Sequence, residues 1–100
     1  MLSKEVLSEV LDLMLEKIEK LEFVDRYIDI YFTDGSRFSL NIYELAFKCK
    51  EYMQTRGYEL VYRNQKCLIY RAGRIIKTIN NEEITSYFEA INYLYSEGII

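Results

Sequence analysis

The sequence predicts an α+β fold in which a mostly antiparallel sheet of about five strands carries three helices, in the order α-ββ-α-βββ-α. Three observations support this class. Apolar residues recur at helical spacing in three segments, and alternating segments bounded by turn residues indicate strands between them. A pattern of strand, glycine-containing turn, strand and helix also occurs twice. At an offset of 69 − 30 = 39 residues, Ile30, Tyr31, Asn41 and Glu44 are identical to Ile69, Tyr70, Asn80 and Glu83.

Residues 2–21 are expected to form the first helix. Apolar side chains follow the i, i+3, i+4, i+7 spacing of one helix face, and acidic side chains fill the other side. The apolar positions are Leu2, Val6, Leu7, Val10, Leu11, Met14, Ile18 and Leu21. Leu13 and Leu15 widen this stripe. The simpler expectation is a helix packed in a broad groove of its own domain, and the alternative is a second surface for a partner helix.

Residues 23–32 alternate as a strand, and Asp34-Gly35 indicates a hairpin. A three-residue loop at 33–35 pairs Ile30 with Phe38 and Ile28 with Leu40, so apolar side chains share one face. A two-residue loop would mix apolar and polar side chains on both faces. The three-residue loop is therefore expected, with Gly35 in the left-handed position.

Asn41 is expected to cap a second helix that runs to about Arg56 and stops at Gly57. Its apolar stripe is Leu45, Cys49, Tyr52 and Met53. Asn80 is expected to cap the last helix in the same way, through about Glu97, with Gly98 ending it. The repeat at an offset of 39 residues has two possible explanations, which stay open: convergent helix capping or a true duplication.

Residues 58–79 are expected to form a three-stranded meander. The strands are Tyr58–Arg63, Cys67–Tyr70 and Arg74–Ile79, with turns at Asn64-Gln65 and Ala72-Gly73. With three-residue loops, one face carries Val61, Ile69 and Ile75, and the other carries Leu60, Tyr62, Leu68, Tyr70 and Ile76. Both faces are apolar, so either helices cover both of them or one face meets another molecule.

Composition indicates the number of domains and the cellular location to expect. The chain has 100 residues, half of them apolar and 29% charged, which is typical of one globular domain spanning 1–100. It shows no signal peptide and no apolar run long enough to span a bilayer, so a cytoplasmic protein without a membrane partner is expected. The Ile/Tyr/Lys/Glu-rich profile is similar to many short open reading frames of AT-rich genomes, including those of thermophilic archaea and their viruses.

The residues for common catalytic chemistry are missing. The chain has no histidine, its four glycines are scattered singly, and no Walker, GxGxxG or GxSxG motif is present. Cys49 and Cys67 are isolated and are expected to be small core residues. Asp25, Asp29, Asp34 and Glu44 suggest a magnesium site, but a solvated strand face explains them better. We therefore expect no catalytic residue, metal or cofactor, and not an enzyme.

Two binding functions fit the pattern better. The net charge of the chain is −3, but its middle segment is basic. Residues 35–81 carry nine basic and three acidic side chains, which gives 9 − 3 = +6. Candidate nucleic-acid contacts are Arg63, Lys66, Arg71, Arg74 and Lys77, with Tyr62 or Tyr70 for base stacking. The preferred expectation is a small non-enzymatic interaction module of regulator or inhibitor type, homodimeric or bound to an unidentified protein. Its expected partner or dimer interface is Leu60, Tyr62, Leu68, Tyr70 and Ile76.

Overall fold

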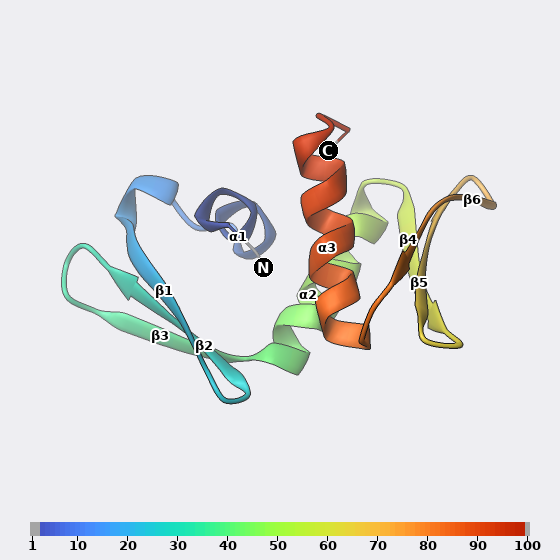
Figure 1. Cartoon of the computed structure of the whole chain (residues 1–100). Helices are drawn as coiled ribbons and strands as arrows, with labels where there is room; N and C mark the ends of the chain where they lie inside the picture. The colour runs from blue at the N-terminus through green and yellow to red at the C-terminus, as the bar shows by residue number, and fades with distance from the viewer. Residues whose placement is uncertain (1–2, 100) are drawn as a thin grey trace.

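The computed structural model describes residues 3–99 as an α+β protein with two antiparallel three-stranded sheets (Figure 1). The elements are α1 (Lys4–Leu11), a 3₁₀ turn (Leu15–Lys17), β1 (Ile18–Val24), β2 (Tyr27–Phe32), β3 (Arg37–Asn41), α2 (Ile42–Thr55), β4 (Tyr58–Arg63), β5 (Lys66–Arg71), β6 (Arg74–Asn80) and α3 (Glu83–Ser96). The predicted class and antiparallel pairing are confirmed. The single sheet of about five strands is wrong, because β1-β2-β3 and β4-β5-β6 form separate sheets.

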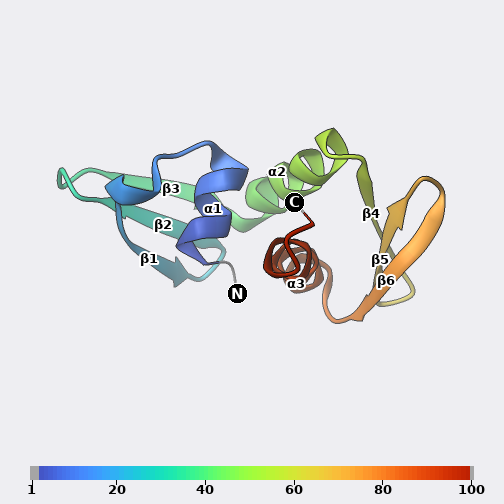
Figure 2. The same cartoon turned by 90° about the horizontal axis from the view of Figure 1, so that it is seen from above.

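The helices lie between the two sheets. Figures 1 and 2 show β1-β2-β3 with α1 at one end of the molecule and β4-β5-β6 at the other, with α2 and α3 in the middle. The principal-axis extents of 44 × 27 × 18 Å record this elongated arrangement. Each sheet therefore turns one face toward the helices and the other face away from them.

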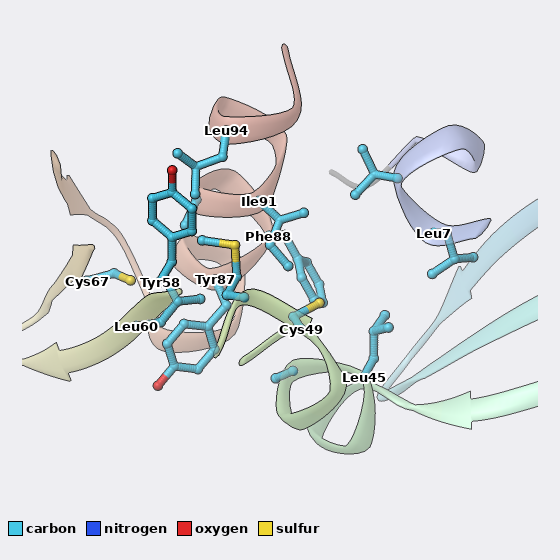
Figure 3. Packing of buried hydrophobic residues seen from close by; sticks show 14 of the residues in the cluster. Leu7, Leu45, Cys49, Tyr58, Leu60, Cys67, Tyr87, Phe88, Ile91 and Leu94 are labelled. Carbon is cyan, nitrogen blue, oxygen red and sulfur yellow. The ribbon is translucent and has the colours of Figure 1, made fainter. Parts of the chain in front are cut away.

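One hydrophobic core connects the three layers (Figure 3). Leu7 of α1, Leu45 of α2 and Ile91 of α3 are fully buried, as are Ile30 of the first sheet and Ile69 of the second. The rings of Phe23 and Phe88 join the first sheet to α3, with centroids 6.5 Å apart. The helices therefore connect both sheets to one shared cluster of buried apolar residues, whose burial is the main favourable term in folding.

The two sheets are equivalent in register at the offset of 39 residues. In the first, Leu21 lies opposite Ile30, and in the second Leu60 lies opposite Ile69. Every pair from Lys20–Tyr31 to Val24–Tyr27 has its counterpart from Glu59–Tyr70 to Arg63–Lys66. The pairs of β2 with β3 match those of β5 with β6 from the strand start as far as Ile30–Phe38 and Ile69–Lys77. The chain is thus two βββα units behind α1.

The units differ at their second turn. Between β2 and β3 the predicted three-residue loop 33–35 is confirmed, with Gly35 at φ +90°. Between β5 and β6 the turn has two residues, Ala72 and Gly73, both at positive φ. The residue thus omitted from the turn is restored in the strand, since Ile76 is an extra, bulged residue between Ile75 and Lys77.

The predicted helix over 2–21 is wrong beyond Leu11, and residue 2 lies outside the described part of the chain. Asp12 adopts the left-handed conformation at φ +55°, and the N–H of Leu13 donates to the carbonyl of Ser8, which ends α1. The second half forms β1. A bulge between Ile18 and Lys20 puts Ile18 and Leu21, three residues apart, on one face of a strand. A spacing of three residues between apolar side chains is also typical of a helix. Periodicity alone therefore predicted a helix where the chain forms β1.

The later helices test the capping predictions. The Asn41 side chain accepts the N–H of Tyr43 at 2.8 Å, so the predicted cap of α2 is confirmed, and Gly57 follows the helix at φ +86°. The predicted Asn80 cap is wrong, because Asn80 is the last residue of β6 and α3 begins at Glu83. The expected end at Gly98 is confirmed, at φ +70°. Helix capping therefore accounts for Asn41 but not for Asn80, although the two residues occupy equivalent positions in strand register.

Candidate functional site: the outer face of the second sheet

The turn between β4 and β5 decides which side chains the second sheet turns outward. Asn64 and Gln65 both adopt positive φ, 53° and 61°, and form a two-residue turn that pairs Arg63 with Lys66. The predicted three-residue loop is wrong by one residue. Because side chains alternate along a strand, this shift moves one strand's residues to the opposite face relative to the other strand.

The predicted interface is consequently split between two faces. Leu60 and Tyr62 point toward the helices; Leu60 is only 3% exposed, and the hydroxyl of Tyr62 donates to the carbonyl of Asn81 at 2.8 Å. Leu68 and Tyr70 point the other way, and Ile76 lies in the bulge of β6. The structure does not bring these five side chains together on one surface.

The outer face instead gathers a different apolar set. Val61 lies opposite Leu68, and Tyr70 lies opposite Ile75. Val61, Leu68 and Tyr70 are half-buried against one another, while Ile75 and Ile76 are 52% and 43% exposed. No helix within residues 3–99 lies on this side of the sheet, since both α2 and α3 pack on the other (Figure 2). We call Val61, Leu68, Tyr70 and Ile75 the outer apolar face.

The first sheet provides an internal comparison. At the offset of 39, Val61 corresponds to Glu22 and Leu68 to Asp29. Glu22 lies directly opposite Asp29, whose carboxylate accepts the hydroxyl of Ser39 at 2.5 Å. The same position in the same kind of sheet is thus charged in one unit and apolar in the other. The charged version is what a water-facing sheet normally carries, so the apolar version needs a separate explanation.

The five candidate nucleic-acid contacts do not form one surface. Arg63 and Lys66 lie opposite each other on the outer side, beside the β4–β5 turn. Arg71 and Arg74 are paired at the other end of the sheet, where the Arg71 guanidinium contacts the hydroxyl of Tyr58 on the helix side. Lys77 also faces the helices, with its amine 4.8 Å from the centre of the Tyr93 ring. A phosphate backbone following one face would meet two of these charges.

The tyrosines proposed for base stacking are also differently placed. The Tyr62 ring packs edge-on against Tyr87 at 6.4 Å, and its hydroxyl is bonded to Asn81. Tyr70 is half-buried on the outer apolar face. Burial raises the pKa of Tyr87 to about 12, in keeping with a core role for that ring.

The carboxylates of the first hairpin serve structural roles. Asp34 accepts the hydroxyl and the N–H of Ser36, and these hydrogen bonds lower the pKa of the Asp34 carboxyl. Asp25 is in the β1–β2 turn at φ +56°. Among residues 3–99, no three His, Cys, Asp or Glu side chains are grouped so that they could hold a metal ion.

Both cysteines lie in the core, as predicted (Figure 3). Burial raises the pKa of the Cys49 thiol to about 12 and raises that of Cys67 as well. Because a thiolate is the reactive form, neither thiol is poised for nucleophilic chemistry.

A surface hollow of about 660 Å³ forms an open groove beside the start of α3. Tyr62, Gln65, Asn80, Asn81, Glu82 and Glu83 line it. The amide of Asn81 is engaged by Glu89, at 2.7 Å, and by the N–H of Glu82. Among these lining residues the hydroxyl of Tyr62 donates to the carbonyl of Asn81 rather than to a carboxylate, so they present no nucleophile–base pair.

Sequence reasoning missed Val61 and Ile75 as outer residues. It also missed Glu59, which lies opposite Tyr70 on the same face. The signal that could have found them is the repeat itself. Leu21 and Leu60 are also identical at the offset of 39, and extending the repeat to them would have predicted a strand around Leu21 like the one around Leu60.

Comparison with family models, curated proteins and solved structures finds no match to this chain. The structure by itself therefore defines the class: a small α+β protein made of two βββα units, in which the middle of the outer sheet face is charged in the first unit and apolar in the second. No helix within residues 3–99 has both the length and the apolar character needed to cross a bilayer.

Proposed function

We propose that this chain is a non-enzymatic interaction module, of regulator or inhibitor type, that binds another protein surface through the outer apolar face. The observation that carries the proposal is the contrast between equivalent positions of the two sheets. Leu68 and Val61 stand where the first unit has Asp29 and Glu22. An antiparallel sheet with one face on the core tolerates polar residues on its other face, so apolar residues there indicate a second contact.

The aromatic and aliphatic composition of this face suits association. Tyr70 offers a large ring with a polar tip beside Leu68 and Ile75, and such rings are enriched in protein interfaces. Glu59, Arg63 and Lys66 surround the apolar centre. An apolar centre with a charged rim is the usual anatomy of a protein–protein contact.

The structure offers a matched pair of positions for a test. Tyr70 and Tyr31 are identical at the offset of 39, and both lie on outer faces. A photo-crosslinking phenylalanine analogue would replace each tyrosine in turn in the full chain. Irradiation would be done with the purified protein and in a lysate of the organism that encodes it.

Specific crosslinks from position 70 but not from position 31 are expected. Equal crosslinking from both positions would show that the outer apolar face is not special. Absence of crosslinks from position 70 in both samples would contradict the proposed function. Circular dichroism of each substituted protein would establish that it is folded.

A further inference from the structure

The outer face of the second sheet is organised in three rows across the strands. The first row is Glu59, Tyr70 and Ile75; the second is Val61, Leu68 and Thr78; the third is Arg63, Lys66 and Asn80. The face is therefore acidic at one end of the strands, apolar in the middle and basic at the other end. Among residues 3–99, neither Glu59 nor Arg63 pairs with another charged side chain, and both are exposed.

A charge gradient of this kind is complementary to its own reversed copy. If a second copy lies face to face with the first and its strands run in the opposite direction, acidic and basic ends meet twice. The rotation that does this is a two-fold axis in the plane of the interface, perpendicular to the strands. Such an isologous contact uses one patch on both subunits.

From these rows we infer that the occupant of the outer apolar face is a second copy of this chain, packed about that two-fold axis with Glu59 against Arg63 of the partner subunit. The inference rests on the proposed function and names its partner. Val61 and Leu68, in the middle row, meet their own counterparts across the axis. The Lys66 amine approaches the ring of the partner's Tyr70, a favourable cation–π arrangement. Sheets packed in this way keep their strands within about 30° of each other.

The other face-to-face two-fold arrangement is less favourable. An axis parallel to the strands would place β4 against β6 and β5 against itself. Lys66 would then face the partner's Lys66, and Glu59 would face the apolar side chain of the partner's Ile75. Like charges across an interface oppose association, and an unpaired carboxylate against an apolar side chain is poorly solvated. Charge therefore selects the perpendicular axis.

The size of the face limits the strength of the dimer. Three strands about 4.8 Å apart and six residues long at about 3.4 Å per residue give a face roughly 14 by 20 Å. This is smaller than the roughly 800 Å² that each partner buries in a standard interface. We therefore expect a dissociation constant in the micromolar range, with exchange between subunits.

Sedimentation equilibrium of the full chain, from about 1 µM to about 1 mM, tests the inference. Wild type is expected to pass from monomer to dimer over this range. Glu59→Lys and Arg63→Glu should each weaken the dimer at least tenfold, because symmetry turns both charge pairs into like-charged pairs. The double variant Glu59→Lys/Arg63→Glu should return to within about threefold of wild type. An equimolar mixture of the two single variants should form a heterodimer.

Three results would overturn the inference. A wild type that remains monomeric excludes the dimer, and crosslinking from position 70 then judges the proposed function separately. A dimer that is indifferent to both single reversals, yet dissociated by Leu68→Asp, excludes the geometry while retaining the face. A dimer that also survives Leu68→Asp forms through another surface and excludes the inferred contact altogether. Thermal unfolding of each variant, followed by circular dichroism, excludes loss of fold as the cause.

Discussion

Leu68 and Asp29 occupy the same register position in two equivalent sheets, each on the face turned away from the helices. Asp29 is hydrogen-bonded to Ser39 in an arrangement suited to water, whereas Leu68 lies between Val61 and Thr78. The middle of the outer face is thus charged in the first sheet and apolar in the second, on equivalent backbones. Positions on the outer face of the first sheet therefore serve as internal controls for substitutions on the outer apolar face.

Leu68→Asp should abolish association through the outer apolar face and leave the fold intact. Its side chain is only half-buried and points away from the helices, so a carboxylate there remains accessible to water in the monomer. In a complex the same carboxylate would be desolvated without a partner. Sedimentation velocity would show a monomer at concentrations where wild type associates.

Val24→Asp is the matched control for this variant. Val24 is 48% exposed and lies on the outer side of β1, an edge strand of the first sheet. The chemical change is the same in kind, but it falls on the face that we assign to solvent. If Val24→Asp dissociates the protein as strongly as Leu68→Asp, then charge rather than position is responsible.

Asn41→Ala should destabilise the protein by about 1 kcal/mol, because it removes the side-chain oxygen that accepts the Tyr43 N–H. Asn80→Ala should cost less than half as much, since Asn80 is an exposed residue of β6 and caps no helix. The measurement is the free energy of unfolding in urea for both variants. Equal losses would mean that Asn80 has a structural role that its position in β6 does not explain.

Cys49 should make stability fall at alkaline pH. Burial raises the pKa of its thiol from 9.0 to about 12, so the neutral thiol is favoured in the folded state. The unfolded chain loses its thiol proton above about pH 9 while the folded chain keeps it, so the stabilisation is complete below that pH and is lost toward pH 12. Urea unfolding between about pH 7 and about pH 10 should show a steeper decline for wild type than for Cys49→Ala.

Ionisation of Cys67 and Tyr87 also contributes to the loss of stability at alkaline pH. The pKa of each is also raised by burial, so Cys49→Ala should retain part of the alkaline decline. Tyr87 contributes near the upper end of the measured pH range, because the ordinary pKa of a tyrosine is 10.0. Identical pH slopes for wild type and Cys49→Ala would contradict a differential ionisation of Cys49.

Nucleic acid should not bind with the salt dependence of a phosphate surface. Arg71 and Arg74 lie at the opposite end of the sheet from Arg63 and Lys66, and Lys77 faces α3. Fluorescence anisotropy with mixed-sequence single- and double-stranded probes should give no micromolar binding at about 50 mM salt. Binding that weakens steeply by about 200 mM salt, and that Arg71→Ala/Arg74→Ala reduces, would restore the nucleic-acid alternative.

Local signals in the sequence predicted much of the fold correctly. The Asn41 cap, the Gly57 and Gly98 stops and the three-residue loop at 33–35 all depend on nearest-neighbour backbone chemistry, which a short segment carries within itself. Burial of Cys49 and Met53 followed from helical spacing. The strands of the second unit were placed to within a residue or two, although their faces were not.

Tertiary structure alone decided the rest. The bulge at Ile18 and Lys20 made a strand resemble a helix, and only pairing with β2 resolves it. The two-residue turn at Asn64 reversed the predicted facing of Leu60 and Ile69, because one residue of loop length exchanges the two sides of a strand. The sequence by itself determined the second and third helices, the strands from Tyr27 onward and the Asn41 cap, because these depend on local backbone chemistry and short-range patterning. Which apolar residues are core and which are left for a partner depends on register between distant strands, and that is settled only when the chain has folded.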